Sequence, residues 1–179
     1  MTSDLPRLTL ILGGARSGKS RYAEGLVALL PPPWLYVATA EALDDEMRER
    51  IAEHRQRRGL DWDVLEVPLD LASVVARGSA RHKALLIDCL TLWLSNVILA
   101  GRDPVAERDG LLHALRRADQ PIVAVSNEVG LGVVPDNGLA RRFRDEQGRL
   151  NAEIAAVADH VVLMAAGLPL VLKSTPGHS

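Results

Sequence analysis

Short, mostly apolar runs alternate along this chain with longer segments in which apolar side chains recur every three or four residues. The short runs predict buried strands at Leu8–Leu12, Trp34–Ala38, Ala84–Ile87 and Pro121–Val125, a weaker strand at Val64–Val67, and closing strands at Val161–Met164 and Leu170–Leu172. The longer segments predict helices at Lys19–Leu30, Asp44–Arg58, Leu69–Ala76, Leu90–Leu99, Val105–Arg117 and Gly138–Ala158. Strands that alternate with helices indicate an α/β fold, in which helices cover both faces of a mainly parallel sheet.

The predicted elements form one domain that spans residues 1–179. No repeat or low-complexity linker interrupts the chain, and its 179 residues suit one domain with a single core. Prolines 31–33 end the first helix, and glycines and a proline mark a loop at Asn127–Asn137. Residues 1–7 and 174–179 are expected to be flexible termini.

Composition weighs against several classes of function. A net charge of −2 and an aromatic content of 3% disfavour nucleic-acid binding. The longest apolar stretch, Leu85–Ala100, is interrupted by polar residues and is too short for an integral membrane span. The N-terminus lacks the basic-then-apolar order of a secretion signal, so we expect a cytoplasmic protein. The single cysteine, Cys89, follows a predicted buried strand and is expected to pack rather than to act as a nucleophile.

The segment from Gly13 to Ser20 has the spacing of a Walker A phosphate-binding loop. Gly13 is followed after four residues by Gly18, Lys19 and Ser20, with an apolar strand before the motif and a helix after it. The glycines let backbone N–H groups turn toward phosphate oxygens, and the start of the helix adds its positive dipole end. We predict that Lys19 reaches the β- and γ-phosphates and that Ser20 binds Mg²⁺. The predicted nucleotide contacts in this loop are Gly13, Gly14, Ala15, Arg16, Ser17, Gly18, Lys19 and Ser20. A glycine-rich turn without a ligand is the alternative.

A carboxylate follows the predicted strand Ala84–Ile87. Asp88 suits the Walker B role of holding Mg²⁺, which a P-loop protein needs at the end of a strand. The alternative is that Asp88 caps the helix that begins at Leu90.

A histidine among arginines is the second unusual feature. On the predicted helix Asp44–Arg58, His54 lies within one turn of Arg50, Arg57 and Arg58. Neighbouring guanidinium groups disfavour another positive charge and would keep the imidazole neutral, which is its nucleophilic form. From the spacing alone, however, a solvated amphipathic helix with one half-buried histidine is the better explanation.

Further motifs accompany these features and together resemble a known family. They are Gly-Gly-Ala-Arg-Ser-Gly-Lys-Ser at 13–20, Tyr-Val-Ala-Thr-Ala at 36–40, Asp-Asp-Glu-Met at 44–47, Arg50-Ile51, His54-Arg55, Ser-Asn-Glu-Val-Gly-Leu-Gly-Val-Val-Pro at 126–135, Arg141, Phe143-Arg144-Asp145 and Gly-Arg-Leu-Asn at 148–151. This set closely resembles the bifunctional adenosylcobinamide kinase/adenosylcobinamide-phosphate guanylyltransferase family of cobalamin biosynthesis, over about Leu8–Lys173. The P-loop is generic, whereas the His-Arg helix and the Asn-Glu-Val-Gly loop are specific.

The resemblance implies two reactions. Members phosphorylate the aminopropanol hydroxyl of adenosylcobinamide with ATP or GTP. They then transfer GMP from GTP to adenosylcobinamide phosphate, which gives adenosyl-GDP-cobinamide and pyrophosphate. This second step passes through a GMP–histidine phosphoramidate, and the matching position here is His54; some relatives carry two adjacent histidines where this chain has Glu53 and His54. The resemblance also implies a P-loop, RecA-like sheet and a homotrimer.

The resemblance also extends the nucleotide site beyond the P-loop. The added positions are Ala38, Thr39, Ala40, Arg55, Gln56, Arg57, Arg58, Glu66 and Asp88. Without the resemblance, Glu66 is equally well explained as a surface acid on a strand.

Some alternatives stay open at this stage. Asn127 and Glu128 either position substrate or Mg²⁺ or only serve the turn that follows their strand. Arg141, Arg144 and Arg149 are surface residues or trimer contacts. A P-loop kinase without a covalent intermediate would give no role to His54. A RecA-like ATPase module that binds DNA or a partner protein would share only the P-loop.

Overall fold

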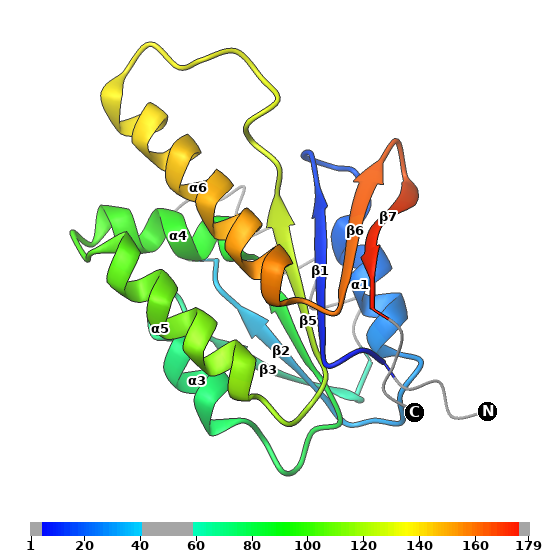
Figure 1. Cartoon of the computed structure of the whole chain (residues 1–179). Helices are drawn as coiled ribbons and strands as arrows, with labels where there is room; N and C mark the ends of the chain where they lie inside the picture. The colour runs from blue at the N-terminus through cyan, green and yellow to red at the C-terminus, as the bar shows by residue number, and fades with distance from the viewer. Residues whose placement is uncertain (1–4, 41–58, 176–179) are drawn as a thin grey trace.

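The computed structural model describes residues 5–40 and 59–175, whose strands form a seven-stranded sheet (Figure 1). The strands are β1 (Leu8–Gly13), β2 (Trp34–Ala38), β3 (Trp62–Glu66), β4 (Leu85–Asp88), β5 (Ile122–Asn127), β6 (His160–Ala165) and β7 (Leu168–Ser174). Their order is β3-β2-β4-β5-β1-β6-β7, and among the described strands only β7 runs antiparallel to its neighbour. The helices are α1 (Lys19–Val27), α3 (Leu71–Arg77), α4 (Leu90–Leu99), α5 (Pro104–Arg117) and α6 (Gly138–Val157). The predicted α/β fold with a mainly parallel sheet is confirmed.

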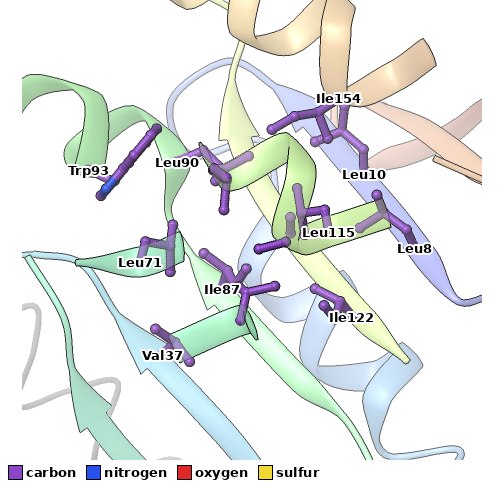
Figure 2. Packing of buried hydrophobic residues seen from close by; sticks show 14 of the residues in the cluster. Leu8, Leu10, Val37, Leu71, Ile87, Leu90, Trp93, Leu115, Ile122 and Ile154 are labelled. Carbon is purple, nitrogen blue, oxygen red and sulfur yellow. The ribbon is translucent and has the colours of Figure 1, made fainter. Parts of the chain in front are cut away.

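Helices cover both faces of this sheet, as predicted. On one face, α3, α4, α5 and α6 enclose the larger buried cluster, which includes Leu10, Ile87, Trp93 and Ile154 (Figures 1 and 2). Trp93 is fully buried, and its indole N–H donates to a main-chain carbonyl 2.8 Å away. On the other face, α1 packs over a smaller cluster. Within residues 5–40 and 59–175, no helix is long and apolar enough to cross a membrane.

Strand β5 shows how the two faces alternate. Ile122 and Ala124 belong to the cluster under α6, whereas Val123 and Val125 belong to the cluster under α1. Successive side chains of a strand point to opposite faces, so the last two residues of β5, Ser126 and Asn127, face α6 and α1 respectively. The carboxyl ends of the parallel strands meet at one edge, where open α/β sheets bind ligands.

The structure corrects the expected ends of the chain. Leu5 packs on the smaller cluster and the Arg7 guanidinium donates to the Leu115 carbonyl at 2.8 Å, so residues 5–7 are held and not flexible. Ser174 is the last residue of β7 rather than the start of a flexible tail. β7 is longer than the predicted Leu170–Leu172 because its backbone pairs with β6 while most of its side chains are exposed. Such a strand leaves a weak apolar signal.

His82 ties the edge strand β3 to the segment between α3 and β4. Its Nδ1 lies 2.6 Å from the Ser79 hydroxyl, and its Nε2 lies 2.7 Å from a carboxylate oxygen of Asp63. The Arg81 guanidinium lies 3.3 Å from the same carboxylate oxygen. The hydrogen bond from His82 is the main cause that lowers the pKa of Asp63, and the positive charge of Arg81 adds to it.

We expect His82→Ala to lower the free energy of unfolding at neutral pH, and we expect this difference from the wild type to shrink in acid. The pKa of Asp63 is lower in the folded chain, so ionised Asp63 contributes stability above the unfolded pKa. That contribution is lost as the pH falls through the folded pKa, which means below about pH 4. The effect is modest, because the Asp63 side chain is 41% exposed.

Denaturant unfolding at a series of pH values measures this effect. Ser79→Ala is the matched control, because it removes the other contact of His82 and leaves the contact with Asp63 in place. It should retain the acid dependence of the wild type. A difference between wild type and His82→Ala that is the same at every pH would contradict the role of Asp63.

Candidate active site

The segment between β1 and α1 forms a tight loop at the carboxyl edge of the sheet. Gly18 has a φ of 92° and directly precedes Lys19, the first residue of α1. Glycine provides no side chain to cap this helix end, so its first N–H groups suit an anion. At Gly13, φ is 153°, and a methyl group there would lie 2.6 Å from the Met164 carbonyl oxygen and 2.7 Å from Ser17 Oγ. Gly13 therefore lets the loop pass close against β6.

Lys19 lies inside this loop. Its side chain is buried, and its ammonium group donates to the Gly14 carbonyl and lies 3.4 Å from Ser17 Oγ. Burial is the largest influence and lowers the pKa of Lys19, while the negative charge of the Asp88 carboxylate opposes this shift. An ammonium group in a low-dielectric loop acts strongly on a phosphate charge. The loop thus holds a cation where the Walker spacing predicts one.

Asp88 ends β4 on the α1 face, beside Tyr36. The Tyr36 hydroxyl donates to one Asp88 carboxylate oxygen at 2.8 Å. The residue that caps α4 is Cys89, and it makes no side-chain capping bond, so the alternative role of Asp88 as a helix cap is wrong. Mg²⁺ takes oxygen ligands, among them hydroxyl groups, carboxylates, phosphates and water. The side chains of Ser20 and Asp88 are therefore of a type that fits this ion.

Of the predicted nucleotide contacts near the end of β2, some lie at neighbouring strand ends, whereas Thr39 is buried. Ala38 pairs in register with both Asp88 and Glu66, which brings three strand ends side by side, and Glu66 is exposed. Thr39 is fully buried: its hydroxyl donates to the Cys89 carbonyl at 2.6 Å and accepts from the Cys89 N–H at 2.8 Å. Its backbone N–H and carbonyl also have partners, in Asp88 and Asn96. Thr39 therefore supports the strand end that carries Asp88.

The Cys89 side chain takes the packing role that the sequence predicts. Burial raises the pKa of its thiol to about 12, and the neighbouring Asp88 carboxylate adds to the shift. A thiol of this kind stays protonated and is a poor nucleophile.

Part of the predicted site lies outside the described residues. His54 and Arg55, Gln56, Arg57 and Arg58 belong to this part, and their roles remain predictions. Sequence reasoning also missed residues that the structure brings to the site. One of them is Tyr36, and the others are a buried set of polar side chains behind β5. Polar residues at otherwise apolar positions of α4 and α6 were the sequence signal that could have indicated this buried set.

Comparison with known proteins identifies the family. The model of the cobinamide kinase / cobinamide phosphate guanyltransferase family matches residues 9–172. The chain belongs to this family. It is accordingly an enzyme of the kinase and nucleotidyltransferase type, and the resemblance stated from the motifs is confirmed.

Relatives of this cobinamide kinase / guanyltransferase chain cover almost its whole length. The bifunctional adenosylcobalamin biosynthesis protein CobP of Pseudomonas aeruginosa is 50% identical over 170 residues, which are 93% of this chain and 98% of the relative. The bifunctional adenosylcobalamin biosynthesis protein CobU of Salmonella typhimurium is 39% identical over 181 residues, with 93% and 99% covered. CobU of Escherichia coli is 37% identical over the same shares.

Solved structures support the fold alone. The flagellar accessory protein FlaH of Methanocaldococcus jannaschii superposes with a TM-score of 0.56 at 13% identity, over 96% of this chain and 80% of that chain. A Pyrococcus horikoshii OT3 protein gives a TM-score of 0.53 at 9% identity, over 95% and 87%. This likeness supports the α/β fold, and the Gly13–Ser20 loop lies in that fold between a strand and a helix, as a P-loop does.

Proposed function

We propose that this chain phosphorylates adenosylcobinamide with ATP or GTP and then transfers GMP from GTP to adenosylcobinamide phosphate. The products of the second step are adenosyl-GDP-cobinamide and pyrophosphate. The observation that carries this proposal is the family match over residues 9–172, on a chain whose P-loop encloses the Lys19 ammonium. Both steps use the same phosphate-binding loop.

In the kinase step, the aminopropanol hydroxyl of the substrate attacks the γ-phosphorus, and the bond to the β–γ bridging oxygen breaks. The proton of the hydroxyl is released to solvent. Such a transfer depends on positioning and on charge neutralisation rather than on covalent chemistry by the protein. The N–H groups at the start of α1 and the Lys19 ammonium supply that neutralisation. Ser20 and Asp88 would hold Mg²⁺, which would supply further positive charge to the phosphate groups.

In the guanylyl transfer, His54 is the nucleophile. A ring nitrogen forms a bond to the α-phosphorus of GTP, and pyrophosphate leaves with the electrons of the broken P–O bond. A phosphate oxygen of adenosylcobinamide phosphate then attacks the same phosphorus, and the P–N bond breaks to restore His54. We propose that Ala38, Ala40, Glu66 and the Arg55–Arg58 run contact the nucleotide during these steps.

We further propose that the chain acts as one cytoplasmic nucleotide-binding domain and assembles as a homotrimer. Exposed apolar side chains support an assembly: Leu168, Leu170 and Leu172 on β7 are 70%, 55% and 55% exposed. Leu131 and Val133 in the loop before α6 are 87% and 96% exposed. Apolar side chains gathered on a surface mark an interaction site. A monomer in sedimentation experiments would contradict the trimer.

The test of the nucleophile is covalent labelling. Purified protein is incubated with Mg²⁺ and GTP labelled at the α-phosphate, then denatured. We expect retained label that is labile in acid and stable in alkali, as a phosphoramidate is, and that is lost in His54→Ala and on removal of Mg²⁺.

His113→Ala is the matched control, because His113 lies on the exposed side of α5, and this variant should retain the label. Label that persists in His54→Ala would rule out this nucleophile. If no label forms although GTP binds, a P-loop kinase without a covalent intermediate is the better account.

A further inference from the structure

Asn127 ends the strand that lies between the P-loop strand and the Asp88 strand. β5 pairs with β1 on one side and with β4 on the other (Figure 1). In this register, Asn127 stands directly opposite Gly13, the first residue of the P-loop. Val125 faces the α1 cluster, so the alternation of β5 directs the Asn127 side chain to the α1 face. The P-loop, Lys19 and Asp88 lie on that same face.

The backbone of Asn127 is held by side chains from two helices. Its N–H donates to Thr91 Oγ1 on α4 at 2.8 Å, and its carbonyl accepts from Asn151 Nδ2 on α6 at 3.0 Å. Asn151 is held in turn, because its Oδ1 accepts from Ser126 Oγ at 2.7 Å and from Gln147 Nε2 at 2.9 Å. Ser126 and Gln147 are fully buried, and Asn151 and Thr91 are nearly so. These buried hydrogen bonds hold the Asn127 backbone in one geometry, although Gln147 Oε1 has no hydrogen-bond partner among the described residues.

The structure separates the roles of Asn127 and Glu128, which the sequence left open together. The Glu128 N–H donates to the Gly13 carbonyl at 3.1 Å, and its carboxylate accepts from the Gly130 N–H at 2.6 Å. Glu128 therefore does serve the turn. By contrast, no hydrogen bond joins the Asn127 side-chain amide to another residue in 5–40 or 59–175. The backbone of Asn127 is held beside the P-loop strand, yet within the described part of the chain its side-chain donor and acceptor atoms have no hydrogen-bond partner.

We propose that the Asn127 side-chain amide donates a hydrogen bond to the terminal phosphoryl group of the bound nucleotide. Asn127 is then a catalytic residue of the kinase step, and Thr91 and Asn151 are positioning residues that act through it. This inference rests on the proposed nucleotide site at Gly13–Ser20. Donors aimed at oxygens that gain or redistribute charge in the transition state stabilise it selectively.

We expect this contact to affect the rates of the two reactions differently. In the kinase step, the bond to the γ-phosphorus breaks, so a donor on a γ-oxygen acts on the reacting group. In guanylylation, the bond at the α-phosphorus breaks, and the γ-phosphoryl group leaves intact within pyrophosphate. A contact that is equal in ground and transition states changes binding and not the rate of the chemical step.

We therefore expect Asn127→Ala to lower kcat of the kinase step by roughly 100-fold or more and kcat of guanylylation by less than about tenfold. The kinase rate is measured as transfer of labelled phosphate from γ-labelled ATP to adenosylcobinamide. The guanylylation rate is measured as labelling of the protein by α-labelled GTP. Asn137→Ala is the matched control, since Asn137 caps α6 through Ala140 at the end of the same loop and should show no kinase-selective loss. Equal losses in both reactions, or no loss in either, would overturn the proposal.

The double variant tests the positioning residues. If Asn151 acts through Asn127, Asn151→Ala should also lower kinase kcat selectively, and adding it to Asn127→Ala should cause little further loss. Additive losses would show that Asn151 acts independently of Asn127 and would overturn its positioning role. Lys19→Ala, assayed in parallel, distinguishes an error in the role of Asn127 from an error in the proposed nucleotide site. If Lys19→Ala abolishes transfer while Asn127→Ala is silent, only the present inference fails; if both are silent, the nucleotide site itself is misplaced.

Discussion

Replacing Lys19 with alanine should lower the rates of both phosphoryl transfer and guanylylation by roughly 100- to 1,000-fold. Lys19 is the cation that the P-loop encloses, and its ammonium already donates to the Gly14 carbonyl and lies near Ser17. A bound triphosphate offers stronger, charged acceptors to the same group. In the kinase step the cation stabilises the charge on the β–γ bridging oxygen, and in guanylylation it stabilises the leaving pyrophosphate. Both rates should therefore fall together.

Two further variants separate charge from packing at this position. The Lys19 side chain is 7% exposed, so alanine also leaves space in the loop. Lys19→Met fills most of that space without the charge, and it should lose as much activity as Lys19→Ala while unfolding closer to the wild type. Lys83→Ala removes a lysine whose side chain is exposed, and it should leave both rates unchanged. A Lys19→Met enzyme with normal turnover in either reaction would refute the role of the ammonium group in that reaction.

The parts of this protein that the sequence predicted well are those with local causes. The Gly13–Ser20 spacing is a property of one loop, and α4 was predicted with its observed ends because an apolar run starts directly after a strand. Asp88 illustrates a role that the sequence alone could not decide. Its two possible roles look alike in sequence, and only the structure shows that Cys89, not Asp88, stands at the cap of α4.

Contacts between distant residues explain what the sequence could not predict. Tyr36 and Asp88 are 52 positions apart, and their hydrogen bond exists because β2 and β4 are neighbours in the sheet. The network behind Asn127 joins α4, β5 and α6 in the same way. Hydrophobic periodicity predicts each of these elements but carries no information on which polar side chains meet. The hairpin of β6 and β7 was underestimated for a different reason, since β7 pairs through its backbone and leaves its side chains exposed.

Gly13→Ala should impair both stability and nucleotide binding, although it adds only one methyl group. That methyl group would lie 2.6 Å from the Met164 carbonyl oxygen, which is backbone and cannot swing away, and 2.7 Å from Ser17 Oγ. Relief requires the loop to move away from β6, at a cost of about 1–3 kcal/mol. For a chain of this length, each kcal/mol lowers Tm by about 2–4 °C. Moving the loop also turns its N–H groups away from the phosphates, so the Kd for GTP should rise at least about tenfold, equivalent to about 1.4 kcal/mol.

Gly14→Ala is the matched control for this variant, because it adds the same methyl group to the next residue of the loop. At Gly14, an added methyl group meets no atom within 4 Å, and φ is not positive. We expect Tm within about 2 °C of the wild type, as for other unstrained surface changes. Thermal unfolding and GTP titration of both variants make the comparison. If Gly13→Ala and Gly14→Ala behave alike, contact with β6 does not set the shape of the loop; if only Gly13→Ala loses both Tm and affinity, the close approach at Met164 is what holds the phosphate-binding N–H groups in place.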